Sequence, residues 1–395
     1  METPGNVSMD IITFFERSQG NYASLMQINN EKAELLIPVI VYISVLMVAG
    51  VVGNPIAFYI YGWKWQKTST RIFLLFLAEI DFINCIVTMP TEIYVMLNYY
   101  YFGSAFACSM SRFFTYTYNN STSVIFLIIA VDRYIRICHP HKESISIAGS
   151  RTACFVSLCV AGAVSWPALF LYGNKYVWLE NKNSYNDSIA AVICEVKNKM
   201  DKTPYPLMYF IYLWCGFTLS LCVLTILYTC IARVILKRKR KKRQHMNVTE
   251  HCNLHENVGT EPLKMSSGLQ QNCTETNSFS ASMRKRLLRG PGSTLMLFCI
   301  TAVFLLSFLP FLIIMTLRQH TGPSFYPSLS PWAQVIVNLM SRSYLVNSCA
   351  NPLVYGLCNS QFRQEVCKLF RRGRKPRSSS LSQMETWQDQ CNVSC

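Results

Sequence analysis

The chain has 395 residues, of which 51% are hydrophobic and only 15% are charged, and its formal net charge is +16. Soluble domains carry about 25% charged residues, so this composition argues against a soluble domain and favours a lipid bilayer, where charged side chains are costly. Nucleic acid is not an expected partner, because most of the 37 Lys and Arg residues flank apolar segments on one side of the predicted membrane.

Seven segments are apolar and long enough to cross a bilayer, which requires about 20 residues of helix. They run over Leu35–Tyr61, Ile72–Leu97, Ala105–Cys138, Thr152–Tyr172, Tyr205–Leu236, Ser293–Leu317 and Pro331–Leu357. The sequence therefore predicts an all-α membrane protein, with a seven-transmembrane helix bundle over 35–358 that follows an N-terminal tail over 1–34. The third segment is the most polar, and we expect the other helices to surround it.

Basic residues indicate the orientation of the chain. They follow the first and seventh spans, lie between the third and fourth spans, and fill the stretch from Lys237 to Arg243. The side that carries them is predicted to be cytoplasmic, which places the N-terminus outside the cell at the plasma membrane. The sequons at Asn6 and Asn186 then face outward and are predicted glycosylation sites.

The segments between and after the spans differ in character. Residues 244–282 are rich in Ser, Thr, Asn, Gln and Glu and lack an apolar period, which predicts a disordered third intracellular loop. Residues 359–370 place their apolar side chains on one helical face, which is typical of an amphipathic helix on the membrane surface. Residues 371–395 are predicted to form a cytoplasmic C-terminal tail. Cys367 lies where a palmitoyl group would reach the inner leaflet.

Five short motifs occur in the expected spans and in the expected order. They are Gly53-Asn54, Leu77–Asp81, Asp132-Arg133-Tyr134, Phe304–Pro310 and Asn351–Tyr355. With them the chain resembles the rhodopsin-like, or class A, G-protein-coupled receptors over roughly Leu35 to Phe370. The resemblance implies a receptor that binds an extracellular ligand and activates a heterotrimeric G protein.

The motif at the end of the third span has a physical logic of its own. Arg133 carries a charge at the cytoplasmic end of the bundle, where an unpaired charge is costly, and Asp132 next to it can hold it while the receptor is silent. Prolines in the sixth and seventh spans remove helix hydrogen bonds and permit two alternative packings. The resemblance implies this switch set: Asp132, Arg133, Tyr134, Tyr228, Phe304, Phe308, Pro310, Asn351, Pro352 and Tyr355.

Two departures from the family pattern affect that switch. Phe308 replaces the usual tryptophan of the sixth span, and Gly290 stands where some members carry an acid that locks Arg133. From the missing acid we expect elevated signalling without agonist. The competing interpretation of Arg133 is an ordinary basic residue at the membrane interface.

An acid in the middle of the second span, Asp81, is a functional candidate by default. The resemblance implies that it belongs to the family's sodium pocket, with hard oxygen ligands around one carboxylate. That set is Asn54, Asp81, Thr122, Asn347, Ser348 and Asn351. The alternative is a protonated structural aspartate without an ion. No other metal and no cofactor are expected. The resemblance also implies a disulfide between Cys108 and Cys194.

The ligand is constrained by what the outer half of the bundle contains. Thr115 stands where amine receptors carry an aspartate, and the seventh span has no lysine for a retinal Schiff base, which excludes an opsin. The ligand-binding candidates are Glu92, Arg112, Thr115, Tyr116, Phe311, Arg318, Arg342 and Tyr344, together with the aromatic side chains of Tyr94, Tyr99 and Tyr118. Mixed charge and aromatic groups favour a peptide, with Glu92 meeting a basic group and the arginines an acidic group.

Alternatives remain at this point. Glu92 and Arg342 could instead neutralise each other, and the ligand could be a lipid or a small acid. A membrane transporter is the rival class, although an odd number of spans without repeated halves argues against it. We find no HExxH, P-loop or GxSxG motif, so an enzyme is not expected.

Further partners follow from the resemblance. The tail serines are predicted phosphorylation sites whose added charge recruits arrestin, so arrestin and receptor kinases are expected partners besides membrane lipid. The serines are Ser378, Ser379, Ser380 and Ser382.

Overall fold

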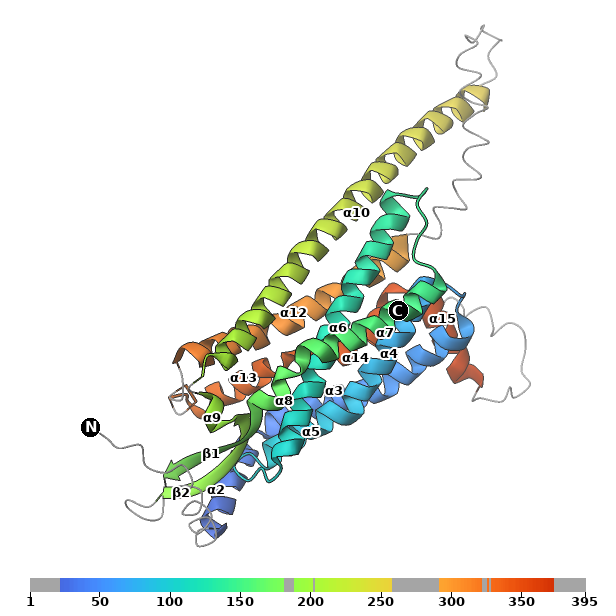
Figure 1. The fold of residues 1–395 in the computed structure, drawn as a ribbon. Helices are drawn as coiled ribbons and strands as arrows, with labels where there is room; N and C mark the ends of the chain where they lie inside the picture. The colour runs from blue at the N-terminus through green and yellow to red at the C-terminus, as the bar shows by residue number, and fades with distance from the viewer. Residues whose placement is uncertain are drawn as a thin grey trace, which may run out of the picture. The chain divides into compact units, whose positions relative to one another are not determined.

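The computed structural model describes residues 22–180, 188–201, 203–257, 291–321, 325–326 and 328–372. Within these residues the helices, in chain order, are α2 (Tyr22–Leu35), α3 (Ile37–Tyr59), α4 (Ser69–Ile83), α5 (Met89–Leu97), α6 (Ala105–Cys138), α7 (Ile147–Ser165), α8 (Pro167–Leu171), α9 (Asn198–Asp201), α10 (Tyr205–Asn257), α12 (Pro291–Thr321), α13 (Pro331–Ser341), α14 (Val346–Cys358) and α15 (Ser360–Arg372) (Figure 1). Two strands, β1 (Tyr172–Glu180) and β2 (Ser188–Val196), form the only sheet of the described residues.

The chain divides into two compact units. Unit 1 comprises Met1–Phe126, Ile147–Ser220 and Ala302–Leu353, and unit 2 comprises Leu127–Ser146, Leu221–Thr301 and Val354–Cys395. Each unit is described here by itself. Unit 1 holds the hairpin and most of the apolar core, and unit 2 holds the Asp132-Arg133-Tyr134 motif.

Five of the predicted spans form helical stretches that are long and apolar enough to cross a membrane. Over the described residues these are Ile37–Lys64, Ser69–Leu97, Ile147–Leu171, Tyr205–Lys241 and Thr294–Thr321. The third predicted span is also helical, and α6 has the predicted bounds, but it carries more charged and polar residues. The seventh is divided into α13 and α14 by a short 3₁₀ turn, so neither part is long enough alone.

Local backbone chemistry explains where these helices change course. A π-helical turn over Asn84–Thr88 joins α4 to α5, directly before Pro90, and Pro167 begins α8 after a break in the fourth span. Proline lacks the N–H of a regular helix bond and is best placed in the first turn of a new helix. Thr68 caps α4 by accepting from the Arg71 N–H at 3.3 Å.

The motif glycine Gly53 allows a close approach between α3 and α14. A Cβ atom added at Gly53 would lie 2.9 Å from Cβ of Pro352, nearer than real Cβ contacts. Because the proline ring is rigid, a larger residue would push the two helices apart. Packing therefore requires a small residue at position 53.

A hairpin and an N-terminal helix lie together at one end of unit 1, where the sequence predicted only loop and tail. Strands β1 and β2 pair antiparallel, with Tyr172 opposite Val196, and α2 packs against β2 (Figure 1). Leu25 of α2 is buried against Ile189 and Ala191 of the hairpin. The N-terminal tail predicted over residues 1–34 contains helix α2 from Tyr22 onward, because the hairpin face offers α2 a surface to pack on.

The fifth helix is longer than predicted. Helix α10 continues from the apolar span through the basic run to Asn257, so residues 244–257 are helical rather than part of a disordered loop. The stretch from Lys237 to Asn257 has no Gly or Pro, and its first seven residues are all Lys or Arg, which are good helix formers. Residues 258–282 lie outside the described part of the chain.

Helix α15 occupies the segment predicted to be amphipathic. The Asn359 side chain begins it by accepting from the backbone N–H groups of Gln361 and Phe362, at 3.1 and 3.2 Å. Phe362 is buried and its ring meets the edge of Tyr355, with centroids 5.7 Å apart. The position of α15 on a membrane surface stays a prediction. The palmitoylation of Cys367, which is half-buried, also stays a prediction.

A matched pair of asparagines tests how α2 is held. Asn29 is buried; its amide donates to the Leu97 carbonyl at 2.9 Å and its oxygen accepts from the Tyr100 N–H at 3.0 Å, whereas the adjacent Asn30 is exposed. Asn29→Ala removes two hydrogen bonds, each of which contributes about 0.5–1.5 kcal/mol. We expect amide hydrogen exchange in α2 to become roughly ten- to a hundred-fold faster, and Asn30→Ala to change it little. Equal exchange in the two variants would contradict this docking.

Candidate functional site

One cavity in unit 1 brings together nine of the eleven ligand-binding candidates, whereas Tyr94 and Tyr118 do not line it. The nine come from α5, α6, α12, the turn after α13 and, for Tyr99, the segment after α5. The walls of the cavity also include residues that sequence reasoning did not name, among them Tyr172, Glu195, Tyr326 and Asn338. The cavity has a volume of about 100 Å³ and is partly open to solvent.

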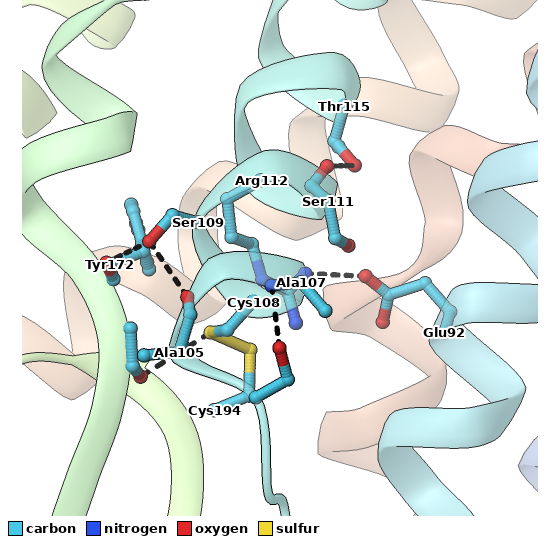
Figure 2. The surroundings of a disulfide bond; sticks show 12 residues. Glu92, Ala105, Ala107, Cys108, Ser109, Ser111, Arg112, Thr115, Tyr172 and Cys194 are labelled. Atoms are coloured by element: carbon cyan, nitrogen blue, oxygen red, sulfur yellow. Dashed lines mark hydrogen bonds and ion pairs between the residues drawn. A yellow bond between two sulfur atoms is a disulfide. The ribbon is translucent and has the colours of Figure 1, made fainter.

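Glu92 is buried at the cavity wall and lies between two arginines. Its Oε1 bonds Nη1 of Arg112, and its Oε2 accepts from Nε of Arg342 at 3.0 Å. Figure 2 shows the Arg112 guanidinium directed at the Glu92 carboxylate. The internal pairing that the sequence left open is thus present, and it includes both arginines. Arg342 is further held by its Nη1, which donates to Oδ1 of Asn338 at 2.8 Å.

A second ion pair forms part of the same cavity wall. Arg318 bonds Glu195 of β2, and its guanidinium lies over the Tyr326 ring, 5.1 Å from the centroid. Glu195 also meets Lys175 of β1 at 3.2 Å. Glu195 directly follows Cys194, which was predicted to form a disulfide with Cys108 at the start of α6. That disulfide was the signal that could have placed Glu195 at the cavity.

The predicted disulfide is confirmed. Cys108 of α6 is bonded to Cys194 of β2, with a Cα–Cα distance of 5.6 Å (Figure 2). Ser109, next to Cys108, donates to the Tyr172 carbonyl at 2.7 Å, so both strands of the hairpin are attached to α6. The Tyr172 hydroxyl lies 2.8 Å from that of Tyr116 in the cavity wall.

Aromatic rings continue from the cavity into the core of unit 1. Phe311 meets the ring of Tyr344 at 5.4 Å and that of Phe308 at 5.3 Å, between centroids. Phe308 is stacked on Phe304 at 6.1 Å, and Phe304 contacts Phe126 at 5.3 Å. Such pairs contribute about 0.5–1.5 kcal/mol each beyond burial. Phe308, which replaces the family's tryptophan, is thus an internal member of a ring column that begins at the cavity.

Asp81 lies at the centre of a buried polar cluster. Its Oδ1 accepts from the Tyr118 hydroxyl and its Oδ2 from Nδ2 of Asn351, both at 2.6 Å. The Tyr118 oxygen in turn accepts from Nδ2 of Asn347 and Oγ of Ser348, each at 2.8 Å. Asn54 joins the cluster by donating to the Ser348 carbonyl at 2.8 Å.

Sequence reasoning missed two members of this cluster. Tyr118 was assigned to the ligand site, but it points to Asp81 instead; it precedes Thr122 by four residues, and side chains four apart share a helix face. Asn84 follows Asp81 by three residues and donates to Oγ of Ser348 at 2.6 Å. The same helical spacing would have found both residues.

The residues around Asp81 offer oxygen atoms to a sodium ion, but the Asp81 carboxylate already accepts hydrogen bonds. Oxygen atoms of Asn54, Thr122 and Asn347 are buried without a hydrogen-bond partner among the described residues, and hard oxygens are what such a cation prefers. The Asp81 carboxylate, which would supply the charge, already accepts one donor on each oxygen. As arranged, an ion would have to use the lone pair that each Asp81 oxygen still has free, beside the Tyr118 and Asn351 donors.

In unit 2, Asp132 is buried and shared by two arginines. Its Oδ2 lies 3.3 Å from Nη2 of Arg133 and 2.9 Å from Nε of Arg136, one turn further along α6. Arg136 was not among the predicted switch residues, although its i,i+4 spacing from Asp132 is the usual one for a helical ion pair. Asp132 therefore restrains Arg133 while it also holds Arg136.

The remaining switch residues occupy several positions. The Tyr228 hydroxyl lies 3.1 Å from Oγ1 of Thr301 in unit 2, and the Tyr134 hydroxyl lies 3.3 Å from Nε2 of His139. Pro310 and Pro352 are inside α12 and α14. Several predicted sites lie outside the described residues, namely Asn6, Asn186, Gly290, Ser378, Ser379, Ser380 and Ser382.

Comparison with known proteins identifies the family. Residues 53–355 match the family described as 7 transmembrane receptor (rhodopsin family). Since the match covers more than half of the chain, the protein belongs to this family and is a multi-pass membrane receptor rather than an enzyme.

Individual relatives are distant but align along most of their length. The chain is 22% identical to the thyrotropin-releasing hormone receptor of Homo sapiens, covering 87% of this chain and 80% of that protein. It is 24% identical to neurotensin receptor type 1 of Mus musculus, covering 90% and 82%. It is 26% identical to cysteinyl leukotriene receptor 2 of Sus scrofa, covering 90% and 88%.

The Asp81 cluster generates a stability prediction with an internal control. Tyr118→Phe deprives the buried Asp81 carboxylate of a donor and two further donors of their acceptor, at about 1–3 kcal/mol for each unpaired group. We expect a thermal midpoint several degrees lower in detergent. Tyr209→Phe is the control, because the Tyr209 hydroxyl is buried without a partner among the described residues. A Tyr118→Phe midpoint as high as that of Tyr209→Phe would contradict the cluster.

Proposed function

We propose that this receptor binds an extracellular peptide in the cavity of unit 1 and activates a heterotrimeric G protein through the Arg133 region of unit 2. The N-terminus lies outside the cell in this proposal, and the protein resides in the plasma membrane. The observation that carries it is the cavity itself, in which charged and aromatic side chains from α5, α6, α12, the turn after α13 and the hairpin surround a space that is partly open to solvent.

The composition of the cavity wall supports a peptide. Three arginines and two glutamates occur among its aromatic side chains, and a peptide carries both charged termini and apolar side chains that such a wall can recognise. Relatives named for thyrotropin-releasing hormone and neurotensin point the same way. A lipid or small acid is the second candidate, supported by the excess of arginine in the wall and by the relative named for cysteinyl leukotriene.

The proposed contact with the G protein uses Arg133. Its guanidinium is held by Asp132 and is mostly buried, so the receptor must rearrange before Arg133 can reach a partner. The terminal carbonyl groups of a helix suit a cation, and a G-protein helix end provides them. Arrestin, receptor kinases and membrane lipid, with phosphorylation of the tail serines and palmitoylation of Cys367, complete the proposal.

A ligand-library screen in cells with a G-protein activation reporter tests the function. We expect one or more peptides to activate the reporter, and Arg133→Gln to remove the response while surface expression is kept. Arg151→Gln is the control, because Arg151 is exposed on α7. A response that survives Arg133→Gln, or uptake of a substrate by vesicles without reporter activation, would contradict the proposal.

The shared carboxylate of Asp132 generates a further prediction. Asp132→Asn removes the charge that holds both Arg133 and Arg136, which favours the rearranged state. We expect agonist-independent reporter activity to rise roughly several-fold, since about 1 kcal/mol changes a two-state ratio by that much. Glu365→Gln serves as the control, because the partner of Glu365, Lys368, is largely exposed. Unchanged basal activity at equal expression would show that Asp132 does not restrain the silent state.

A further inference from the structure

The charges in the cavity wall do not balance. Arg112, Arg318 and Arg342 supply three positive charges, whereas Glu92 and Glu195 supply two negative ones. Removing a charge from water costs several kcal/mol unless a partner compensates it. The wall therefore holds one positive charge without a counterpart among its own residues.

The excess charge can be assigned to Glu92 and its two arginines. Arg318 bonds Glu195 of the hairpin, and Lys175, which shares Glu195, is also paired with Asp201 at 2.8 Å, so this second group is neutral. Glu92 must serve both Arg112 and Arg342, whose side chains are only 17% and 10% exposed. One carboxylate thus faces two buried guanidiniums, and this trio carries a net positive charge.

The two guanidiniums also have donors to offer. Each guanidinium carries five N–H groups in a planar fork that matches a carboxylate. Within the described residues Arg112 uses Nη1 on Glu92, and Arg342 uses Nε on Glu92 and Nη1 on Asn338. No contact of that part of the chain engages Nη2 of either arginine, so both remain available to a ligand.

We propose that Arg112 and Arg342 bind a carboxylate of the ligand, and that Glu92 is their internal counter-charge rather than a partner for a basic ligand group. This proposal rests on the cavity being the ligand site, as proposed above. A carboxylate in this place makes the trio and the ligand group electrically neutral together. The rings of Phe311 and Tyr344 also line the cavity, so the group attached to the carboxylate is expected to be aromatic or aliphatic.

Asn119 adds a second requirement. It lines the same cavity two helical turns from Arg112, about 10 Å along α6. Its Nδ2 donates to the Thr115 carbonyl at 2.8 Å, while its Oδ1 is buried without a hydrogen-bond partner in the described structure. A ligand N–H would satisfy that oxygen, so an amide next to the apolar group is favoured. A peptide's free C-terminus combines these features, and a fatty acid supplies only the carboxylate and the apolar chain.

Purified receptor and three small probes test the charge assignment. N-acetylphenylalanine carries the carboxylate, N-acetylphenylalaninamide has the same body without charge, and phenethylamine carries the opposite charge. We expect only the acid to raise the thermal unfolding midpoint at millimolar concentration, as a ligand of the folded state does. Stabilisation by phenethylamine, or equal effects of the acid and the amide, would overturn the proposal.

Three glutamine variants separate this effect from a general loss of folding. Arg112→Gln makes the trio neutral while Glu92 keeps Arg342, and we expect the acid to bind at least about ten-fold more weakly. Glu92→Gln increases the positive charge and is expected to keep or strengthen binding. Arg151→Gln is the control, because Arg151 is exposed on α7 and does not line the cavity, and it should change binding by less than about three-fold. Binding that is lost in Glu92→Gln but kept in Arg112→Gln would reverse the assignment.

Two comparisons in the reporter cells show whether the ligand carboxylate belongs to a peptide or to a lipid acid. In the reporter cells, peptides with a free C-terminus are compared with their amidated forms, and long-chain fatty acids with their methyl esters. Loss of activity on amidation identifies a peptide, and loss on esterification identifies a lipid acid. If the reporter responds to ligands that ignore Arg112→Gln, this inference fails and the receptor function stands. If N-acetylphenylalanine binds but no G protein responds to any ligand, the proposed function fails alone.

A separate observation concerns the polar cluster around Asp81. The Tyr118 hydroxyl donates its one proton to Asp81 and accepts from Asn347 and Ser348, so its hydrogen-bonding capacity is fully used. With Asn351 on the other oxygen, each oxygen of Asp81 accepts a hydrogen bond from a side chain. We infer that the Tyr118 hydroxyl replaces a bound sodium ion in this receptor.

A salt exchange tests this second inference without measuring signalling. Thermal unfolding of purified receptor is followed in sodium chloride and in choline chloride at equal ionic strength. We expect equal midpoints, because in this inference the Tyr118 hydroxyl proton takes the place beside Asp81 that an ion would occupy. A midpoint that rises with sodium in the native protein, and no longer does so in Asp81→Asn, would overturn the inference.

Discussion

The structure depends on one constraint: a polar group inside a membrane helix bundle must find its partner within the protein, because lipid offers none. Glu92 and Asp81 are buried carboxylates that meet this requirement differently. Glu92 is paired with two arginines, whereas Asp81 accepts hydrogen bonds from neutral side chains. The pairing at Glu92 leaves one positive charge in excess at the cavity. The hydrogen bonds at Asp81 bring in no charged partner.

The same constraint separates the parts of unit 1 that bind from those that transmit. Charged groups line the cavity, and the polar cluster lies around Asp81. An apolar column of rings from Tyr344 to Phe126 extends from that cavity through the core. Packed rings have few alternative arrangements at native density, so a ligand that moves Phe311 must also move Phe308. Phe308 stands where the family has a tryptophan, and its ring keeps the column continuous between Phe311 and Phe304.

Much of this organisation was predictable because membrane spans are read from composition alone. The bounds of α6 agree with the prediction, and nine of the eleven ligand-binding candidates share one cavity. The errors came where tertiary packing decides. Helix α2 has a weakly apolar sequence and packs against a hairpin that the local sequence pattern did not predict. Tyr118 was misassigned because its neighbour Tyr116 faces the cavity, although residues two apart on a helix point about 200° apart.

The disulfide has a mechanical consequence. Helix α2 is packed on β2, β2 is joined covalently to α6 through Cys194 and Cys108, and α6 is continuous to the helical turn that carries Arg133. A force that displaces β2 therefore acts on the first turn of α6 through the Cys194–Cys108 bond, whereas α2 acts on β2 through apolar packing.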